Sequence, residues 1–240
     1  MKDGNGISLE VKVWGDFACF TRPEFGVERV SYEVMTPSAA RGILEAIFWK
    51  PEFRWLVREI SVLKPIRHYS ILRNEMNSVQ SERSARGWQA VGGGYYADDD
   101  RAQRHTLCLR DVAYIIRADI ELKEHANDHP AKYRDQFRRR VKRGQCFTQP
   151  YLGTREFSAA FGPLEGDEEP IEQGEEHGLG LMLFDVLFEP KKKGAVSFAS
   201  HGSGGRREIV SADAQPVFFQ ARLKDGVLKV PPELYERRKT

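Results

Sequence analysis

Apolar and polar residues alternate along several stretches of the first two thirds of the chain. Residues 7–13 place Ile, Leu or Val at every second position, which is typical of a strand buried on one face. Shorter apolar runs predict strands at 60–63 and 157–161, and a long alternation predicts another at 112–122. The N-terminal part of the chain is therefore expected to build a sheet.

Two segments between these strands carry the end signals of helices. Thr36 and Pro37 supply a capping hydroxyl and a proline at the first helical position, and apolar residues then recur at helical spacing. A second helix is expected to open at Asp128 and Pro130 and to end before Gly144. The resulting order, β-α-β-β-α-β, predicts an α+β protein whose N-terminal domain is ferredoxin-like, the arrangement that RNA recognition motifs share.

The pattern changes at two places that divide the chain. Residues 67–105 are polar and glycine-rich, which predicts a long insertion in an N-terminal domain of residues 1–164. Residues 165–178 are acidic and contain no Lys or Arg, which predicts an exposed linker. Beyond the linker, a small antiparallel β-sheet domain is expected over 179–240. Its expected strands are 181–188, 195–199, 207–210, 217–223 and 227–230, the last two joined by a turn at Asp225-Gly226.

Composition excludes several classes of protein. The chain has 240 residues, of which 40% are hydrophobic, and this is enough for a core and excludes global disorder. No apolar run approaches the ~20 residues that a membrane helix needs, and residues 1–6 lack the apolar core of a secretory signal. Cys19, Cys108 and Cys146 are odd in number and far apart, so free thiols in a reducing cytoplasm are expected, with no metal site.

The net charge of +2 conceals a basic block. Between Lys132 and Arg143 the second predicted helix carries seven basic residues and one acid. A solvated helix face is the usual explanation of a charge run, but such faces mix signs. The excess of one sign favours contact with an RNA backbone, and it also predicts salt-sensitive, non-specific binding of duplex DNA. The expected RNA contacts on this helix are Arg134, Arg138, Arg139, Arg140, Lys142 and Arg143.

Two further segments are weaker candidates. Glycines precede Arg206 and Arg207, which can take phosphate oxygens, although a flexible hairpin loop explains the segment equally well. Asp98 to Asp100 suggest a metal, but they lack the calcium-loop spacing, and an exposed loop is the preferred interpretation. The six histidines show no zinc spacing, and no Walker or Gly-x-Ser-x-Gly motif occurs.

Several longer motifs carry a more specific resemblance. They are WGDFACFTRP at 14–23, SYEV at 31–34, TPSAARGILEAIFWKP at 36–51, LKPI at 63–66, LRDVAY at 109–114 and YLGTREF at 151–157. Together they resemble the type I-C CRISPR-associated Cas5 endonuclease subunit. The resemblance runs from about residue 7 to about residue 230, and the first motifs are the most specific.

This resemblance implies a fold and an activity. The family combines an RNA-recognition-motif-like ferredoxin domain with a small C-terminal β-sheet. Its members cut precursor CRISPR RNA within the repeat, retain the guide and join the other subunits of the surveillance complex. Cleavage in the family uses no metal or other cofactor, because the ribose 2′-hydroxyl attacks the adjacent phosphorus. Such a reaction needs a base, positive charge at the phosphorane and an acid for the leaving oxygen.

The resemblance also implies where the catalytic groups lie. The family places a Tyr before the Trp-Lys-Pro of the first helix and a Lys-His pair at the second helix. The aligned residues here are Phe48, Lys132 and Tyr133. Phe48 transfers no proton, and a tyrosine with a pKa near 10 is a poor base at neutral pH. Both aromatic residues also fit the apolar stripes of their helices. His129 is an alternative general base, but it is also explained as a residue that flanks the start of the second helix.

The sequence therefore predicts a repeat-specific endoribonuclease. Lys132 is expected to stabilise the charge of the transition state, with Tyr133 as a proton donor or positioning hydroxyl. One alternative is a binding module of the same fold that holds guide RNA without cutting it. The other is a metal-dependent nuclease that uses Asp98 to Asp100.

Overall fold

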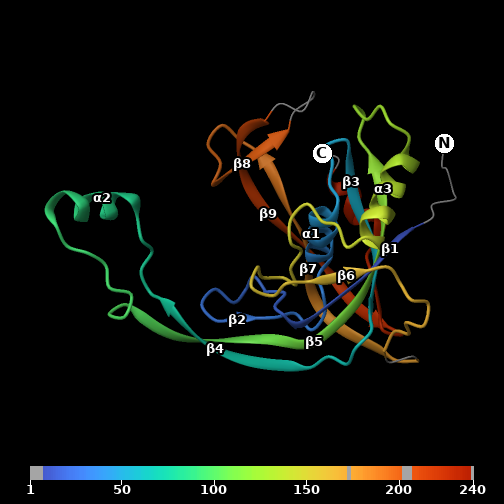
Figure 1. Cartoon of the computed structure of the whole chain (residues 1–240), viewed down its shortest axis with the longest axis horizontal. Helices are drawn as coiled ribbons and strands as arrows, with labels where there is room; N and C mark the ends of the chain where they lie inside the picture. Colours follow the sequence, from blue (N-terminus) through green and yellow to red (C-terminus); the bar gives the residue numbers. More distant parts are fainter. Residues whose placement is uncertain (1–7, 172–173, 202–206, 239–240) are drawn as a thin grey trace.

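A computed structural model describes residues 8–171, 174–201 and 207–238 (Figure 1). Within these ranges the chain is a mostly antiparallel α+β protein, as predicted, and no helix is long and apolar enough to cross a membrane. The strands are β1 (Leu9–Ala18), β2 (Arg29–Val30), β3 (Phe53–Val62), β4 (His68–Met76), β5 (Arg101–Leu122), β6 (Ala160–Gly162), β7 (Glu176–Pro190), β8 (Val196–His201), β9 (Arg207–Lys224) and β10 (Val227–Lys229). The helices are α1 (Pro37–Ile47), α2 (Glu82–Val91), α3 (Pro130–Lys142) and the 3₁₀ helix η1 (Pro232–Arg238).

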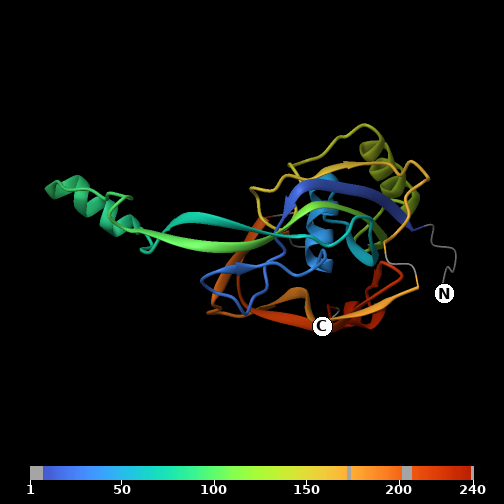
Figure 2. The ribbon, with the colours of Figure 1, turned by 90° about the horizontal axis from the view of Figure 1, so that it is seen from below.

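One sheet runs through the molecule in the order β6-β1-β5-β3-β10-β9-β7, with every neighbouring pair on this path antiparallel. Strand β10 joins the early and late strands, because it pairs with both β3 and β9. Helix α1 packs against β3 and also against β7, and Figure 2 shows it between the two halves of the curved sheet. Helix α3 covers β5, β1 and β6.

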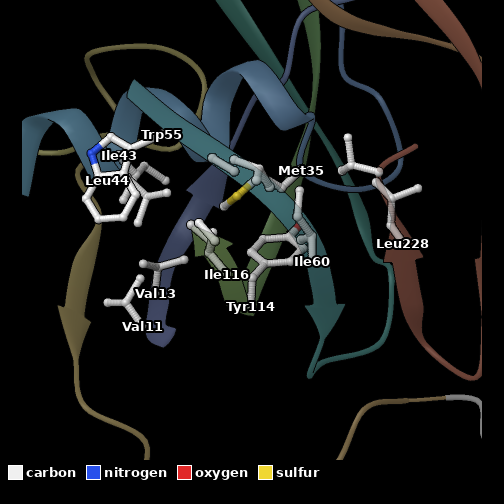
Figure 3. Close-up of a cluster of buried hydrophobic side chains, with 14 of the residues drawn as sticks. Val11, Val13, Met35, Ile43, Leu44, Trp55, Ile60, Tyr114, Ile116 and Leu228 are labelled. Atoms are coloured by element: carbon white, nitrogen blue, oxygen red, sulfur yellow. The ribbon is translucent and has the colours of Figure 1, made fainter. Parts of the chain in front are cut away.

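The core lies where these elements meet (Figure 3). Trp55 is fully buried at its centre, and its indole N–H donates to the carbonyl oxygen of Phe48 at 2.9 Å. Burying each large apolar side chain contributes about 1.5–3 kcal/mol, so this cluster accounts for much of the stability. Its members come from β1, α1, β3, β5 and β10 and include Val11, Val13, Ile43, Leu44, Ile60, Tyr114, Ile116 and Leu228.

The helix caps and the tight turn form largely as predicted. The Thr36 hydroxyl accepts a hydrogen bond from the backbone N–H of Ala39 at 3.2 Å, and Pro37 opens α1. Asp225 and Gly226 both have positive φ angles, 52° and 69°, as a tight turn between β9 and β10 requires. Helix α3 begins at Pro130, as predicted, and the side chain that caps it is that of His129.

Residues 67–105, predicted as a polar insertion, mainly form a long arm. Strand β4 pairs with the first half of β5 from His68 opposite Leu109 to Met76 opposite Arg101, and α2 lies near the tip. Figures 1 and 2 show the arm reaching far beyond the rest of the molecule. No residue of α2 is buried. The apolar periodicity of a half-buried element is therefore missing here, and the strands escaped prediction.

Three other strands differ from their predicted bounds. β3 begins at Phe53, well before residue 60, because Trp55, Leu56 and Val57 are buried in succession and hide the alternation. The strands predicted at 207–210 and 217–223 are one strand, β9. Its polar middle is held between two neighbours, since Ala212 lies opposite both Pro190 of β7 and Val196 of β8. The fourth predicted strand is shorter and later, at β6.

The acidic segment after β6 is tied to β1. The ammonium nitrogen of Lys12 lies 3.1 Å from a carboxylate oxygen of Glu168, whose side chain is only 4% exposed. The same carboxylate accepts hydrogen bonds from the backbone N–H groups of Glu165 and Gly166, each at 2.9 Å. These hydrogen bonds lower the pKa of Glu168 to about 2.

This depressed pKa predicts a pH-dependent contribution to stability. The contribution of Glu168 should be complete above the ordinary carboxyl pKa of about 4.3 and lost as the pH falls towards 2. Glu168→Gln should therefore lower the unfolding temperature at pH 7, and the gap to the wild type should close in acid. Thermal unfolding from pH 2 to 7 tests this, with the exposed neighbour changed in Glu169→Gln as a control for lost charge. Equal effects of the two variants would contradict it.

Candidate functional site

Helix α3 carries most of the predicted site and buries only one stripe of side chains. Tyr133, Phe137 and Val141 recur every four residues and are the buried residues of the helix. They pack towards the sheet, and Phe137 meets Trp55 with ring centroids 4.8 Å apart. The periodicity thus turns the remaining positions, most of them basic, towards the surface.

The cations at α3 and its C-cap are of three kinds: two form surface ion pairs, one is used structurally, and four form no ion pair within the described residues. Lys132 pairs with Asp128 at 2.7 Å and Arg138 with Asp135 at 3.3 Å, both on the surface. Arg140 is used structurally, because its guanidinium donates to the carbonyl oxygen of Ile47 at 2.7 Å and lies over the ring of Phe48. The other four cations make no ion pair with any residue that the structure describes. They are Arg134, Arg139, Lys142 and Arg143.

The two aromatic residues aligned with catalytic positions lie in the core. Phe48 is 1% exposed and Tyr133 is 3% exposed. Both contact the ring of Phe53, at centroid distances of 5.4 Å and 5.3 Å. Phe48 and Tyr133 therefore contact the same buried ring, while Lys132 is exposed on the surface.

Among the described residues, the hydroxyl of Tyr133 and one carboxylate oxygen of Glu52 are buried and have no hydrogen-bond partner. Burial raises the pKa of Tyr133, and the negative charge of nearby Glu52 raises it further. Tyr133 accordingly stays protonated at neutral pH. In this position it can donate a proton or a hydrogen bond, but it cannot serve as a general base.

The unpartnered hydroxyl predicts an unusual response to mutation. A buried polar group without a partner costs about 1–3 kcal/mol, so Tyr133→Phe should raise the free energy of unfolding by about 1 kcal/mol. Denaturant titration measures this change. The control is Tyr235→Phe, which removes a buried hydroxyl that donates to the carbonyl oxygen of Val57 at 3.0 Å and should lower stability by about 1 kcal/mol. A comparable loss in both variants would mean that Tyr133 has a partner in solution.

The remaining polar groups of the site lie at the start of α3. A hydrogen bond to Asp128 raises the pKa of Lys132, which is therefore fully charged at neutral pH. The Nδ1 atom of His129 accepts the backbone N–H of Ala131 at 3.3 Å as the cap of the helix. A neutral imidazole that accepts at Nδ1 carries its proton on Nε2. While His129 caps the helix, the lone pair of its Nδ1 atom is engaged by the backbone and does not face a substrate.

The weaker candidates do not form a second site within the described residues. Arg206 is outside the described residues, and Arg207 is the first residue of β9. On the arm, Asp98 pairs with Arg101, whereas Asp100 accepts from the backbone N–H of Ser78 and from the hydroxyl of Tyr95. Because Asp98 and Asp100 bind different partners, the structure does not favour a metal site shared by Asp98 to Asp100.

Sequence reasoning missed a group of exposed aromatic residues next to α1. Trp49, Phe147 and Tyr151 line a hollow of about 660 Å³ at the end of this helix. They come from two separate segments, so no single motif in the sequence brings them together. The available signal was that Trp49 directly follows the buried stripe of α1 and yet cannot belong to it.

Comparison with known proteins places the chain in a family. The model of the CRISPR-associated Cas5 proteins matches residues 8–231, which is nearly the whole length. The chain belongs to the Cas5 family. Two Cas5 relatives, each named CRISPR pre-crRNA endoribonuclease Cas5d, match most of it. One from Thermus thermophilus is 48% identical over 95% of this chain and 93% of its own. One from Mannheimia succiniciproducens is 43% identical over 93% of this chain and 95% of its own.

Solved structures agree with a Cas5 fold. A CRISPR-associated protein superposes with a TM-score of 0.61 at 22% identity, over 95% of this chain and 94% of its own. A functionally uncharacterised protein from Streptococcus mutans superposes equally well, at 19% identity and the same coverage. The fold of this Cas5 chain is therefore shared by proteins whose sequences have diverged widely.

Proposed function

We propose that the chain is an endoribonuclease that cuts precursor CRISPR RNA within its repeat, retains the guide and works with the other subunits of a type I-C surveillance complex in the cytoplasm. The relatives at 48% and 43% identity are named as pre-crRNA endoribonucleases, which supports this activity. The observation that carries the proposal is the surface of α3, where the charged Lys132 stands beside a helix face with four cations that lack ion-pair partners in the described ranges.

The proposed chemistry is an attack of the ribose 2′-hydroxyl on the adjacent phosphorus. Lys132 approaches the phosphorane oxygens and stabilises the charge that grows there. Its ion pair with Asp128 is exposed, and such pairs contribute only about 0–1 kcal/mol, so a phosphate can replace the carboxylate at little cost. Tyr133 is the candidate donor to the leaving 5′-oxygen, because it stays protonated. This donation requires its hydroxyl to turn out from the ring of Phe53.

The strand order supports a finer description of the fold. We infer that β6-β1-β5-β3, with α1 and α3 in contact, form the ferredoxin-like unit that RNA recognition motifs share. The first of these strands in the chain lies inside the sheet and all neighbours are antiparallel, as this arrangement requires. The division into residues 1–164 and 179–240 stays a prediction, since β10 links both parts in one sheet.

A cleavage assay in EDTA tests the proposed function. Purified protein incubated with its cognate repeat RNA should make one specific cut that leaves a 2′,3′-cyclic phosphate and a 5′-hydroxyl. A 2′-deoxyribose at the nucleotide before the cut should abolish the reaction, because the nucleophile is then missing. Activity that appears only after a divalent ion is added would contradict this chemistry and favour a metal-dependent nuclease.

A second function is favoured by one observation. Two of the three positions aligned with catalytic groups, Phe48 and Tyr133, are buried in the core. The alternative is therefore an RNA- or DNA-binding subunit that holds the guide without cutting it. Tight binding of repeat RNA with no cut, in EDTA and in magnesium alike, would support this alternative.

The proposed RNA surface on α3 predicts a change in salt dependence. Arg139 and Arg143 lack ion-pair partners in the described part of the chain, and each phosphate contact contributes about one unit to the slope of log affinity against log salt. Replacing both by alanine should weaken RNA and duplex DNA binding and lower the slope by about two. Filter binding at several salt concentrations measures it. Lys191→Ala, on the β7–β8 loop, is the control for lost charge. An unchanged slope in the double variant would make α3 a solvated face.

A further inference from the structure

A continuous hollow follows the outer face of α1. It consists of two adjoining parts of about 280 Å³ and 660 Å³, which share Gly42 and Tyr151 in their walls. The first part begins near Thr36 at the start of the helix, and the second ends at Trp49 just after it. We call the whole hollow the α1 groove. A helix of this length spans about 16 Å, which is room for several stacked nucleotides at about 3.4 Å each.

Helix α1 forms the floor of the groove, and its small side chains leave space above it. Most of the residues of α1 that line the groove are small, and three of them, Ala39, Gly42 and Ala46, recur at helical spacing. The segment that contains Phe147 and Thr148 forms a wall of the groove and is hydrogen-bonded to α1. The backbone N–H groups of Phe147 and Thr148 both donate to the carbonyl oxygen of Ala46, at 2.8 Å and 3.2 Å. The groove is thus built by backbone contacts and does not depend on one flexible side chain.

Three aromatic side chains line the larger part of the groove. Trp49 is 41% exposed, Phe147 79% and Tyr151 40%. Exposed apolar side chains that occur singly need no explanation, but three rings gathered in one hollow indicate a binding surface. Their flat faces suit ligands that are flat as well, because aromatic rings stack on one another.

One cation lies in the wall of the groove, and two more stand close to its rings in the sequence. Arg155 lines the groove, Lys50 directly follows Trp49, and Arg143, which caps the end of α3, precedes Phe147 by four residues. None of the three makes an ion pair within the described ranges. The acid in the wall, Glu45, is already paired with Arg41 at 2.8 Å. Aromatic faces combined with unpaired cations are the pattern that binds single-stranded nucleic acid, where bases stack and phosphates meet positive charge.

We propose that the α1 groove binds unpaired nucleotides of the RNA, with bases stacked on Trp49, Phe147 and Tyr151 and phosphates at Lys50 and Arg155. This rests on the proposed function for the identity of the RNA, and it assigns a single-strand site next to the cutting site on α3. A protein partner is the less fitting occupant, because an apolar protein surface would leave the cations without counter-charges.

Removing the rings one at a time tests the groove. The probe is a short oligouridine RNA that forms no hairpin, and its affinity is measured by anisotropy. Stacking of one base on one ring is worth enough to change affinity about 5- to 100-fold, so Trp49→Ala and Phe147→Ala should each weaken binding by that factor. Phe25→Ala removes a similarly exposed ring that lines neither part of the groove, and it should leave the affinity unchanged. Equal affinity of all three variants and the wild type would overturn the proposal.

Filling the groove gives a second test that leaves the rings intact. A Cβ at Gly42 meets nothing within 4 Å, so Gly42→Gln should fold normally and place a long side chain on the groove floor. Gly87→Gln makes the same change in α2, where a Cβ is equally free of contacts. We expect weaker oligouridine binding from Gly42→Gln and wild-type binding from Gly87→Gln. Wild-type binding by Gly42→Gln would overturn the proposal.

Failure of the groove and failure of the proposed function can be told apart. If the wild type does not cut repeat RNA but the groove variants lose oligouridine binding, the single-strand site stands and the nuclease does not. If the wild type cuts and the groove variants keep full oligouridine affinity, the nuclease stands and the groove proposal fails. Variants that bind RNA normally but no longer associate with a purified partner subunit would also overturn the proposal, in favour of a protein interface.

Discussion

Lys132→Ala should slow the cleavage of repeat RNA about 100- to 1,000-fold while changing RNA affinity little. The ammonium of Lys132 is exposed and charged, and it is expected to meet the scissile phosphate as negative charge accumulates. A group that acts mainly in the transition state lowers the barrier more than it strengthens binding. Loss of one such donor typically costs about 2.7–4 kcal/mol of barrier. Single-turnover cleavage and a gel-shift titration with the same RNA separate the two effects.

Two matched variants sharpen this result. Asp128→Asn removes the ion-pair partner of Lys132 but leaves its charge, so cleavage should persist. Lys224→Ala removes an exposed lysine from the far end of β9 and should cut at the wild-type rate. Wild-type cleavage by Lys132→Ala would show that the catalytic lysine of the family has not kept its role in this chain.

Phe48→Ala should have the second large effect, and it should act on stability. Phe48 is 1% exposed and packs between Phe53 and the guanidinium of Arg140. Truncation of a buried phenylalanine typically costs about 3–5 kcal/mol, because a cavity remains where the ring was. A loss of this size is a large part of the stability of a small protein. Denaturant titration of the purified variant measures it.

The conservative variant tells a structural role from a catalytic one. Phe48→Leu keeps an apolar side chain in the core and should lose less stability than Phe48→Ala. Because Phe48 carries no proton-transfer group, Phe48→Leu should cut repeat RNA at close to the wild-type rate at a temperature where it is folded. A folded Phe48→Leu protein without activity would mean that the ring itself positions the RNA.

The elements that sequence could predict are those with a buried face and clear ends. Helix α1 has a capping Thr36 and an apolar stripe, and α3 has Pro130 at its start and Gly144 after its end. The turn at Asp225-Gly226 follows from local conformational preference alone. Strands escaped prediction where burial is two-sided, as in β3, or where the half-buried face carries charged residues, as in β4 of the arm. Apolar alternation indicates a strand with one apolar face, and neither segment shows it.

Part of the candidate site, like part of the fold, could be predicted from the sequence. The charge of α3 and the burial of Tyr133 both follow from the period of that helix. Two facts depend on tertiary structure and left no trace in the sequence. One is that Arg140 turns inward to Phe48 and Ile47, unlike its neighbours. The other is that Trp49 and Phe147 line the same part of the α1 groove, since their segments come together only after α3 has returned the chain to α1.

Pairing of β3 with β10 ties an early strand to one of the last. Ile60 of β3 lies opposite Leu228 of β10. During synthesis, one edge of β3 therefore stays unpaired until residues 227–229 have left the ribosome. Closing so long a loop is slow, and an open apolar edge invites association with other chains. The sheet of this protein is therefore expected to close late in folding, and β3 is open to association with other chains until β10 has paired with it.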